Sequence, residues 1–206
     1  RPFCHTIALV MPGRHNVMNA LAAATVAMRY GMAPETVARI LASQHTISPH
    51  RMALSTVNRE GTSFTLIDDS FNANPDSMKA GLNGLKAWNS NDGKEPFRVA
   101  LLGAMLELGA DETALHTSIG TYADELGIDA IIAVGSAQDQ HLDALAQALA
   151  DGARQSQSAS VDCVHDIDAA EQLVIDLARN HPDAVVLLKG SHASGLSALA
   201  ERWAKN

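Results

Sequence analysis

Two adjacent carboxylates close one short apolar run of this sequence. Asp68 and Asp69 are followed by Ser-Phe-Asn-Ala-Asn-Pro, which places Asn72 and Asn74 just before Pro75. Two neighbouring acids are costly to bury unless each is paired with a cation or with hydrogen-bond donors. A sugar hydroxyl or an amine substrate would satisfy one of them, which makes this a candidate binding loop. The alternative is a strand–helix turn in which Asn74 is the N-cap and Pro75 opens the helix.

Two further apolar runs also end in residues that suggest chemistry. Lys189-Gly190-Ser191 follows one of them and is typical of a turn that holds an anion, because helix N-termini and backbone N–H groups favour negative charge. The other ends in Gly103-Ala-Met-Leu-Glu-Leu-Gly109, a pattern that an ordinary loop also fits. Neither is a P-loop, since Gly93-Lys94 is followed by Glu95, and no Gly-x-Gly-x-x-Gly fingerprint occurs.

Asparagines mark a fourth candidate, near the start of the chain. Asn16 and Asn19 are three residues apart in a predicted helix over 15–30, so they share one face. Their amides suit the edge of a purine or a nearby phosphate, although a polar helix start explains them equally well. The nine histidines and two cysteines show no metal-ligand spacing, and no Gly-x-Ser-x-Gly elbow is present. His116 lies inside a predicted helix and is interpreted as a packed or solvated residue.

Short apolar runs alternate with helical patterns over most of the chain, and this predicts how the candidate residues are positioned. Uninterrupted apolar strands between helices indicate a parallel sheet covered on both faces, and ligands bind such sheets beyond the carboxyl ends of the strands. The fold class predicted is therefore α/β, an open, doubly wound, Rossmann-like and mostly parallel sheet with an N-terminal hairpin. The predicted strands are 51–57, 63–68, 99–102, 130–134, 160–164 and 184–188, and the predicted helices are 75–88, 112–126, 138–150, 169–180 and 196–203.

The first 47 residues follow a different pattern. A short strand over 6–10 and two helices over 15–30 and 35–42 are predicted there, and the polar stretch 43–50 reads as a linker. We expect a domain boundary at this linker, with a complete α/β domain over 48–206. Because the chain opens with Arg1 rather than Met, we also expect it to be part of a longer protein.

Composition excludes several classes. The 206 residues carry a formal net charge of −8, and no Lys/Arg run occurs, so a nucleic-acid partner is not expected. No apolar stretch is long enough to cross a membrane, and no signal peptide opens the chain. Two cysteines far apart, Cys4 and Cys163, favour a reducing compartment, and the predicted location is the cytoplasm.

Four stretches in this order resemble the Mur ligases: Pro12–Ala23, Asp68–Met78, Leu102–Gly109 and Lys189–Ser191. The resemblance implies an ATP-dependent ligase that phosphorylates a carboxylate to an acyl phosphate, which an amine then attacks. The Asn-Ala-Asn-Pro-Asp-Ser segment favours the member that joins D-Ala-D-Ala to a UDP-N-acetylmuramoyl tripeptide. The resemblance also implies that residues 1–47 are the tail of a central ATP-binding domain and that residues 48–206 are the C-terminal domain. By the same resemblance, the phosphate loop and the Mg²⁺ ligands lie upstream of Arg1.

The resemblance assigns nucleotide-binding roles to five residues. Asn19 is similar to the family's adenine-side asparagine, and His15 and Asn16 shape the same loop. Arg51 resembles the arginine that reaches the ATP phosphates, and Asp69 resembles the acid that holds the ribose. The fragment alone is expected to be inactive, because the phosphate cradle is upstream.

The substrate side is assigned in the same way. Asn72 and Asn74 are placed near the reacting groups, while Lys189 and Ser191 resemble the strand-end motif that faces the peptide substrate. Arg51 and Lys189 are the two residues expected to act in catalysis. Three positions depart from the family pattern: Ala104 replaces a common aspartate, His192 a common arginine and Phe71 a common tyrosine.

Two other functions remain open. One is a non-catalytic nucleotide- or peptide-binding module of the same fold. The other is a folylpolyglutamate-synthase-like ligase, which would use glutamate instead of D-Ala-D-Ala as the amine.

Overall fold

The computed structural model describes residues 6–9, 14–43, 50–89, 95–155 and 159–205. The chain divides into two compact units, Arg1–Pro49 and His50–Asn206. The second unit holds the α/β sheet and most of the candidate residues.

The described part of the first unit is a pair of helices, α1 (Arg14–Arg29) and α2 (Pro34–Ala42). Gly31 follows α1 with a φ of 90°, a value that favours glycine and ends the helix as predicted. The strand predicted over 6–10 is wrong over 6–9, which form no strand; residue 10 lies outside the described residues. A strand needs a hydrogen-bonded neighbour, and none of the residues described in this unit forms one.

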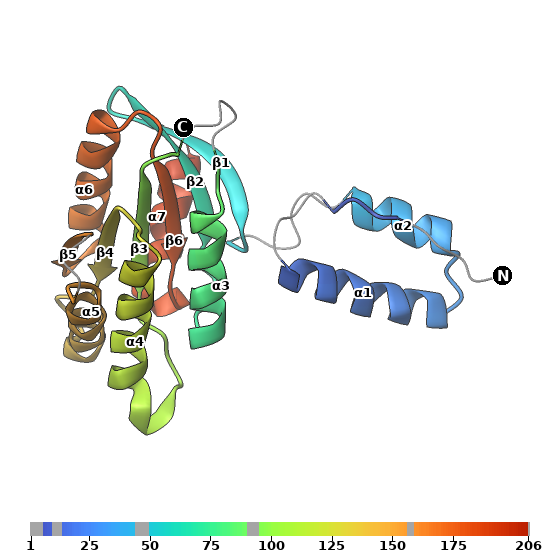
Figure 1. Ribbon diagram of the computed structural model, residues 1–206, viewed down its shortest axis with the longest axis horizontal. Helices are drawn as coiled ribbons and strands as arrows, with labels where there is room; N and C mark the ends of the chain where they lie inside the picture. Colours follow the sequence, from blue (N-terminus) through green and yellow to red (C-terminus); the bar gives the residue numbers. More distant parts are fainter. Residues whose placement is uncertain (1–5, 10–13, 44–49, 90–94, 156–158, 206) are drawn as a thin grey trace. The chain divides into compact units, whose positions relative to one another are not determined.

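The second unit is built on a six-stranded sheet in the order β1-β2-β6-β3-β4-β5 (Figure 1). Only the β1–β2 pair is antiparallel, so the mostly parallel sheet with an N-terminal hairpin is confirmed. The hairpin closes through Glu60 and Gly61, both with positive φ, as in a two-residue type I′ turn. The strands are β1 (Ala53–Arg59), β2 (Thr62–Asp69), β3 (Arg98–Gly103), β4 (Ala130–Val134), β5 (Ser160–Val164) and β6 (Val185–Lys189).

Five helices cover the two faces of this sheet (Figure 1). They are α3 (Pro75–Lys86), α4 (Glu112–Glu125), α5 (Gln140–Ala153), α6 (Ile167–Asn180) and α7 (Leu196–Ala204). One apolar core joins the sheet to α3, α4 and α5, and a second joins it to α6 and α7. All residues of β3, β4 and β6 are buried, which explains their uninterrupted apolar sequences.

Candidate active-site edge at the strand ends

Two of the motifs meet at the carboxyl edge of the sheet. β2 and β6 are parallel neighbours, and their register sets Asp69 directly beside Lys189. β3 lies on the other side of β6, where Leu102 pairs with Lys189. Residues 120 positions apart in sequence therefore share one edge, where open α/β sheets bind ligands.

A buried ion pair joins these two motifs. The Lys189 Nζ donates to Asp69 Oδ2 at 2.6 Å and to the Asn72 carbonyl at 3.2 Å. The Lys189 side chain is 2% exposed and that of Asp69 is 18% exposed. An ammonium group has three N–H donors, and these two bonds use two of them. The Lys189 side chain is thus held beneath Asp69 and does not reach out into solvent.

A glycine makes room for the Lys189 stem. A Cβ added at Gly81 of α3 would lie 2.7 Å from Lys189 Cδ, closer than carbon atoms pack. The aliphatic part of this lysine therefore runs across the helix at the position where α3 has no side chain.

Asp68, the other acid of the pair, is satisfied by different groups. Its Oδ2 accepts from His50 Nδ1 at 2.8 Å, and its Oδ1 accepts from the Ser70 N–H at 3.2 Å and the Ser70 hydroxyl at 2.6 Å. The expectation that two neighbouring acids need separate partners is therefore met in detail. Asp69 Oδ1 also accepts from the Met52 N–H at 3.3 Å.

Arg51 is exposed at the same edge. Its guanidinium carbon lies 4.4 Å from the centroid of the Phe71 ring, a cation–π contact that leaves the N–H groups at the ring's rim available to an anion. Phe71 is itself exposed, so the Arg51–Phe71 pair presents a positive charge to solvent.

The two asparagines of the loop have different local roles. Asn74 caps α3: its Oδ1 accepts from the Ser77 N–H at 2.8 Å, in a reciprocal capping box. The prediction that Asn74 is the N-cap is confirmed. Because its side-chain oxygen is used by the cap, only the amide N–H groups of Asn74 could bind a ligand. Asn72 is exposed, its carbonyl holds Lys189, and its side-chain oxygen accepts from the Ala73 N–H at 2.8 Å.

Ser191 closes the turn after β6. Its N–H donates to the Ala104 carbonyl at 2.9 Å, and its carbonyl accepts from the Ser194 hydroxyl at 2.6 Å. Its own hydroxyl oxygen is buried without a hydrogen-bond partner among the described residues. A buried polar atom of this kind calls for an explanation, and a ligand hydrogen bond is one.

His116 holds the loop that follows β3. It is fully buried; its Nε2 accepts from the Met105 N–H at 2.8 Å, and its Nδ1 donates to the Glu112 carbonyl at 2.7 Å. Burial lowers the pKa of His116, so the ring is kept neutral with its proton on Nδ1. The packed-residue interpretation is confirmed.

The adenine-side candidates lie in the first unit. Asn16 and Asn19 both sit on α1, with Asn16 buried and Asn19 exposed. His15 is also on α1, but its side chain lies outside the described set. Their nucleotide role stays a prediction.

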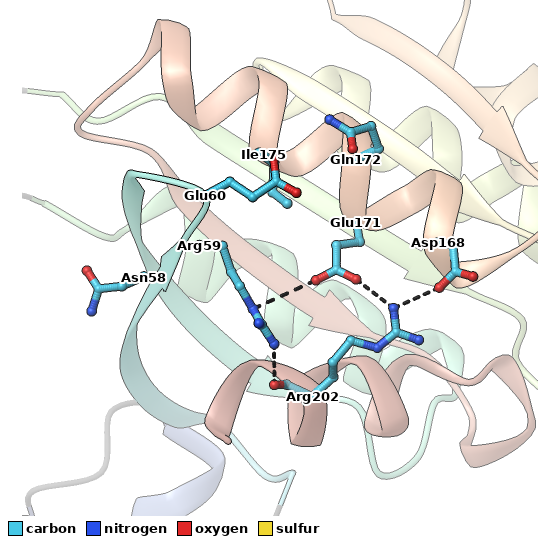
Figure 2. A pocket seen from close by; sticks show the side chains of 8 residues that line it. All are labelled: Asn58, Arg59, Glu60, Asp168, Glu171, Gln172, Ile175 and Arg202. Carbon is cyan, nitrogen blue, oxygen red and sulfur yellow. Dashed lines mark hydrogen bonds and ion pairs between the residues drawn. The ribbon is translucent and has the colours of Figure 1, made fainter. Parts of the chain in front are cut away.

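A second charged region surrounds a cavity of about 470 Å³ near the hairpin turn and α6 and α7 (Figure 2). Arg202 pairs with Asp168 at 2.7 Å and with Glu171 at 2.6 Å, and the Trp203 Nε1 donates to Glu171 at 2.8 Å. Arg59 donates to the Arg202 carbonyl. These charges satisfy one another, and no residue that the sequence singled out lines this cavity.

Sequence reasoning missed the role of His50 at the strand-end site. The histidine was visible only as the residue before Arg51, and no spacing rule connects it with Asp68, 18 positions away. Within the described residues, no cluster of three or more His, Cys, Asp or Glu side chains could hold a metal ion. Nor does that part of the chain contain a helix long and apolar enough to span a membrane.

Comparison with known proteins identifies the family to which this chain belongs. Residues 50–192 match the family described as Mur ligase, glutamate ligase domain. The chain belongs to the Mur ligase family.

Several relatives within the family share one name. The chain is 39% identical over 197 residues to the UDP-N-acetylmuramoyl-tripeptide–D-alanyl-D-alanine ligase of Mycobacterium tuberculosis, covering 92% of this chain and 38% of that protein. The crystal structure II of MurF from Acinetobacter baumannii covers 97% of this chain at a TM-score of 0.76 and 26% identity. MurF from Thermotoga maritima, solved in complex with ADP, has the same fold at a TM-score of 0.65 and 22% identity, covering 94% of this chain and 39% of that one.

The chain spans well under half of each relative, 38% of the M. tuberculosis protein and 40% of the A. baumannii chain. The family and fold are therefore established over nearly the whole chain, while activity concerns a longer protein.

Proposed function

We propose that this chain is the C-terminal part of an ATP-dependent ligase that adds D-Ala-D-Ala to a UDP-N-acetylmuramoyl tripeptide, a step of peptidoglycan precursor synthesis. The observation that carries the proposal is the strand-end edge, where the Asp69–Lys189 pair, the Arg51 charge and the buried Ser191 hydroxyl come together. The names of the M. tuberculosis and A. baumannii relatives support this substrate pair over others.

The proposed reaction requires no covalent bond between these side chains and the substrates. A carboxylate is a poor electrophile, so the acceptor carboxylate takes the γ-phosphoryl group of ATP, giving an acyl phosphate and ADP. The amine of D-Ala-D-Ala attacks the carbonyl carbon, phosphate leaves, and the amine loses a proton as the amide bond forms. Positioning and charge neutralisation are what a protein contributes to phosphoryl transfer.

The described residues can be matched to these tasks. Arg51, exposed and positively charged, would neutralise the transferring phosphoryl group. Asp69 keeps lone pairs free after its two bonds and could accept a ribose hydroxyl. Lys189 fixes Asp69 and the Asn72 loop, and Asn74 and Ser191 would contact the substrate.

The adenine role belongs to the first unit in this proposal, with His15, Asn16 and Asn19 on α1. The acids at the strand ends do not fit a Mg²⁺ site, because Asp68 is held by His50 and Asp69 by Lys189. We therefore assign Mg²⁺ binding and the phosphate loop to the part of the longer protein that precedes this chain. ATP is a cytoplasmic metabolite, so we place the reaction in the cytoplasm.

The test is product formation by the full-length protein. With ATP, UDP-N-acetylmuramoyl tripeptide and D-Ala-D-Ala, we expect phosphate release and a product whose mass has increased by one D-Ala-D-Ala residue pair. The isolated 206 residues should release no phosphate. Arg51→Ala in the full-length protein should slow turnover by about a hundredfold, because a charge at the transferring phosphoryl group is lost, with little change in unfolding.

Two outcomes would contradict the proposal. A folate product extended by glutamate would identify a folylpolyglutamate-synthase-like ligase. Binding of nucleotide or peptide without any product would favour a non-catalytic module.

A further inference from the structure

His50 is the first residue of the second unit, and acids lie near both nitrogens of its ring. Nδ1 lies 2.8 Å from Asp68 Oδ2, and Nε2 lies 3.6 Å from Glu201 Oε1. The side chains of His50 and Asp68 are 16% and 11% exposed, so the contact is largely shielded from water. An ionised carboxylate only accepts hydrogen bonds, so Nδ1 carries the proton.

The backbone around His50 is fixed as well. The Phe71 N–H donates to the His50 carbonyl at 3.1 Å, and the Met52 N–H donates to Asp69 Oδ1 at 3.3 Å. His50 and Met52 have φ values of 59° and 50°, in the left-handed region that residues other than glycine rarely adopt. Such a backbone persists only where its surroundings hold it in place.

Arg51 lies between these two tied residues, and its guanidinium rests on Phe71. The segment 50–52 is therefore attached at each residue to the strand-end segment 68–71. The direction in which the Arg51 side chain leaves the fold depends on the backbone of His50, which the Asp68 contact secures.

Other described histidine–carboxylate contacts lack this arrangement. His165 pairs with Asp143 at 2.6 Å and His141 with Glu112 at 3.3 Å, but these histidine side chains are 60% and 56% exposed. Neither histidine adjoins an arginine. His165 is thus a matched control: the same pair of groups at the end of a different strand.

We propose that His50, acting through Asp68, is a positioning residue for Arg51 in the ligase reaction. The inference rests on the proposed function, because it needs Arg51 to meet a phosphoryl group. His50 itself touches no reacting atom; it fixes the left-handed turn from which Arg51 extends.

Substitutions separate the hydrogen bond from the backbone effect. His50→Asn retains an amide donor close to Nδ1, and asparagine tolerates the left-handed region. His50→Gly keeps the backbone conformation accessible but removes the donor. Asp68→Asn keeps the size of the acid and removes its charge, which offers a second variant if His50→Gly folds poorly.

The experiment measures kcat and KM for ATP in the full-length enzyme, with unfolding monitored for each variant. His50→Gly and Asp68→Asn should each lower kcat/KM by about tenfold to a hundredfold, since a small misplacement of a positioning group costs this much. His50→Asn should recover most of the loss. His165→Ala should leave kcat/KM unchanged.

A double-mutant cycle with Arg51→Ala gives the decisive readout. If His50 acts through Arg51, His50→Gly and Asp68→Asn should change kcat/KM less than about twofold once Arg51 is alanine. If the role is purely structural, each variant should lower kcat/KM by the same factor whether residue 51 is arginine or alanine, and this result would overturn the inference. Full activity of His50→Gly and Asp68→Asn in the enzyme that retains Arg51 would overturn it as well. Absence of D-Ala-D-Ala ligation by the unmodified full-length protein would instead reject the proposed function, and with it the positioning role in that reaction.

Discussion

The second unit contains two clusters in which basic and acidic side chains pair, one at the strand ends and one around Arg202. They differ in how far the cation is buried. The Lys189–Asp69 pair lies at the strand ends, with Lys189 2% and Asp69 18% exposed. The Arg202 cluster lies at α6 and α7 (Figure 2), where the side chains of Arg202, Asp168 and Glu171 are 41%, 78% and 15% exposed. The cations differ most in burial, since Asp69 and Glu171 are shielded to a similar degree. Both are short ion pairs, so distance alone does not separate them.

The difference shows that a cavity alone does not mark a candidate functional site. Around the cavity of about 470 Å³, arginines and acids neutralise one another and tie the hairpin turn to the last two helices. At the strand ends, the Arg51 charge is exposed and the buried Ser191 hydroxyl has no hydrogen-bond partner among the described residues. A buried pair is costly to form, and its location where α/β sheets bind ligands is consistent with function.

The largest effect should come from breaking the buried pair. Lys189→Met keeps the aliphatic stem against Gly81 but leaves Asp69 without its cation and the Asn72 carbonyl without a donor. We expect the free energy of unfolding to fall by about 3 kcal/mol, as when one partner of a buried ion pair is removed. Urea denaturation measures it.

The control for this prediction is Lys79→Met, which removes an exposed lysine from the same layer of helices. Its nitrogen lies 5.5 Å from the Tyr122 ring, so a change below about 1 kcal/mol is expected. Equal losses of unfolding free energy in Lys189→Met and Lys79→Met would show that the buried position of Lys189 adds nothing to its contribution to stability.

Much of the α/β fold could be predicted because its strands and helices have distinct sequence periods. The apolar run 130–134 and the N-cap Asn74 were predicted at the residues where they occur. The strand over 6–10 failed over 6–9 because apolar character alone does not supply a neighbouring strand.

The candidate edge could be predicted in outline but not in its contacts. Strand-end rules pointed to Asp69 and Lys189, yet nothing local tells that β2 and β6 are neighbours, because their pairing joins segments 120 residues apart. The His50–Asp68 contact requires a left-handed backbone at a histidine, which residue type does not predict. Local patterns therefore locate the edge, and only the tertiary fold decides which groups pair.

A buried histidine at this edge should make stability depend on pH. Burial lowers the pKa of His116. As the pH falls through about 6.5, the unfolded chain therefore binds a proton that the native ring does not yet accept. The stabilisation is fully present above pH 6.5 and is lost as the pH falls through the lowered pKa. The free energy of unfolding should fall by up to about 1.4 kcal/mol per pH unit in that window, and denaturation at several pH values would show it.

A variant of His116 tests this assignment, and His165 gives a contrast of opposite sign. His116→Gln should flatten the loss on the acid side, since glutamine does not titrate. His165 has the opposite sign: the hydrogen bond that its ring donates to Asp143 raises the pKa of His165. Its stabilisation is therefore present below pH 6.5 and lost as the pH rises through the raised pKa. A steeper acid-side loss in His116→Gln than in the parent chain would contradict the assignment.

The smallest effect is expected at the exposed cluster. Arg202→Met removes the contacts to Asp168 and Glu171, but Glu171 keeps the Trp203 N–H at 2.8 Å. Because the Arg202 side chain is 41% exposed, its ion pairs are expected to contribute about 0.5–1 kcal/mol, to be measured by the same denaturation experiment. Because exposed charges are screened within about 3 Å at 1 M salt and buried pairs much less, high salt should shrink the Arg202 loss and preserve the Lys189 loss. If salt reduced both losses equally, the contrast between the buried lysine at the strand ends and the more exposed arginine beside α6 would not hold.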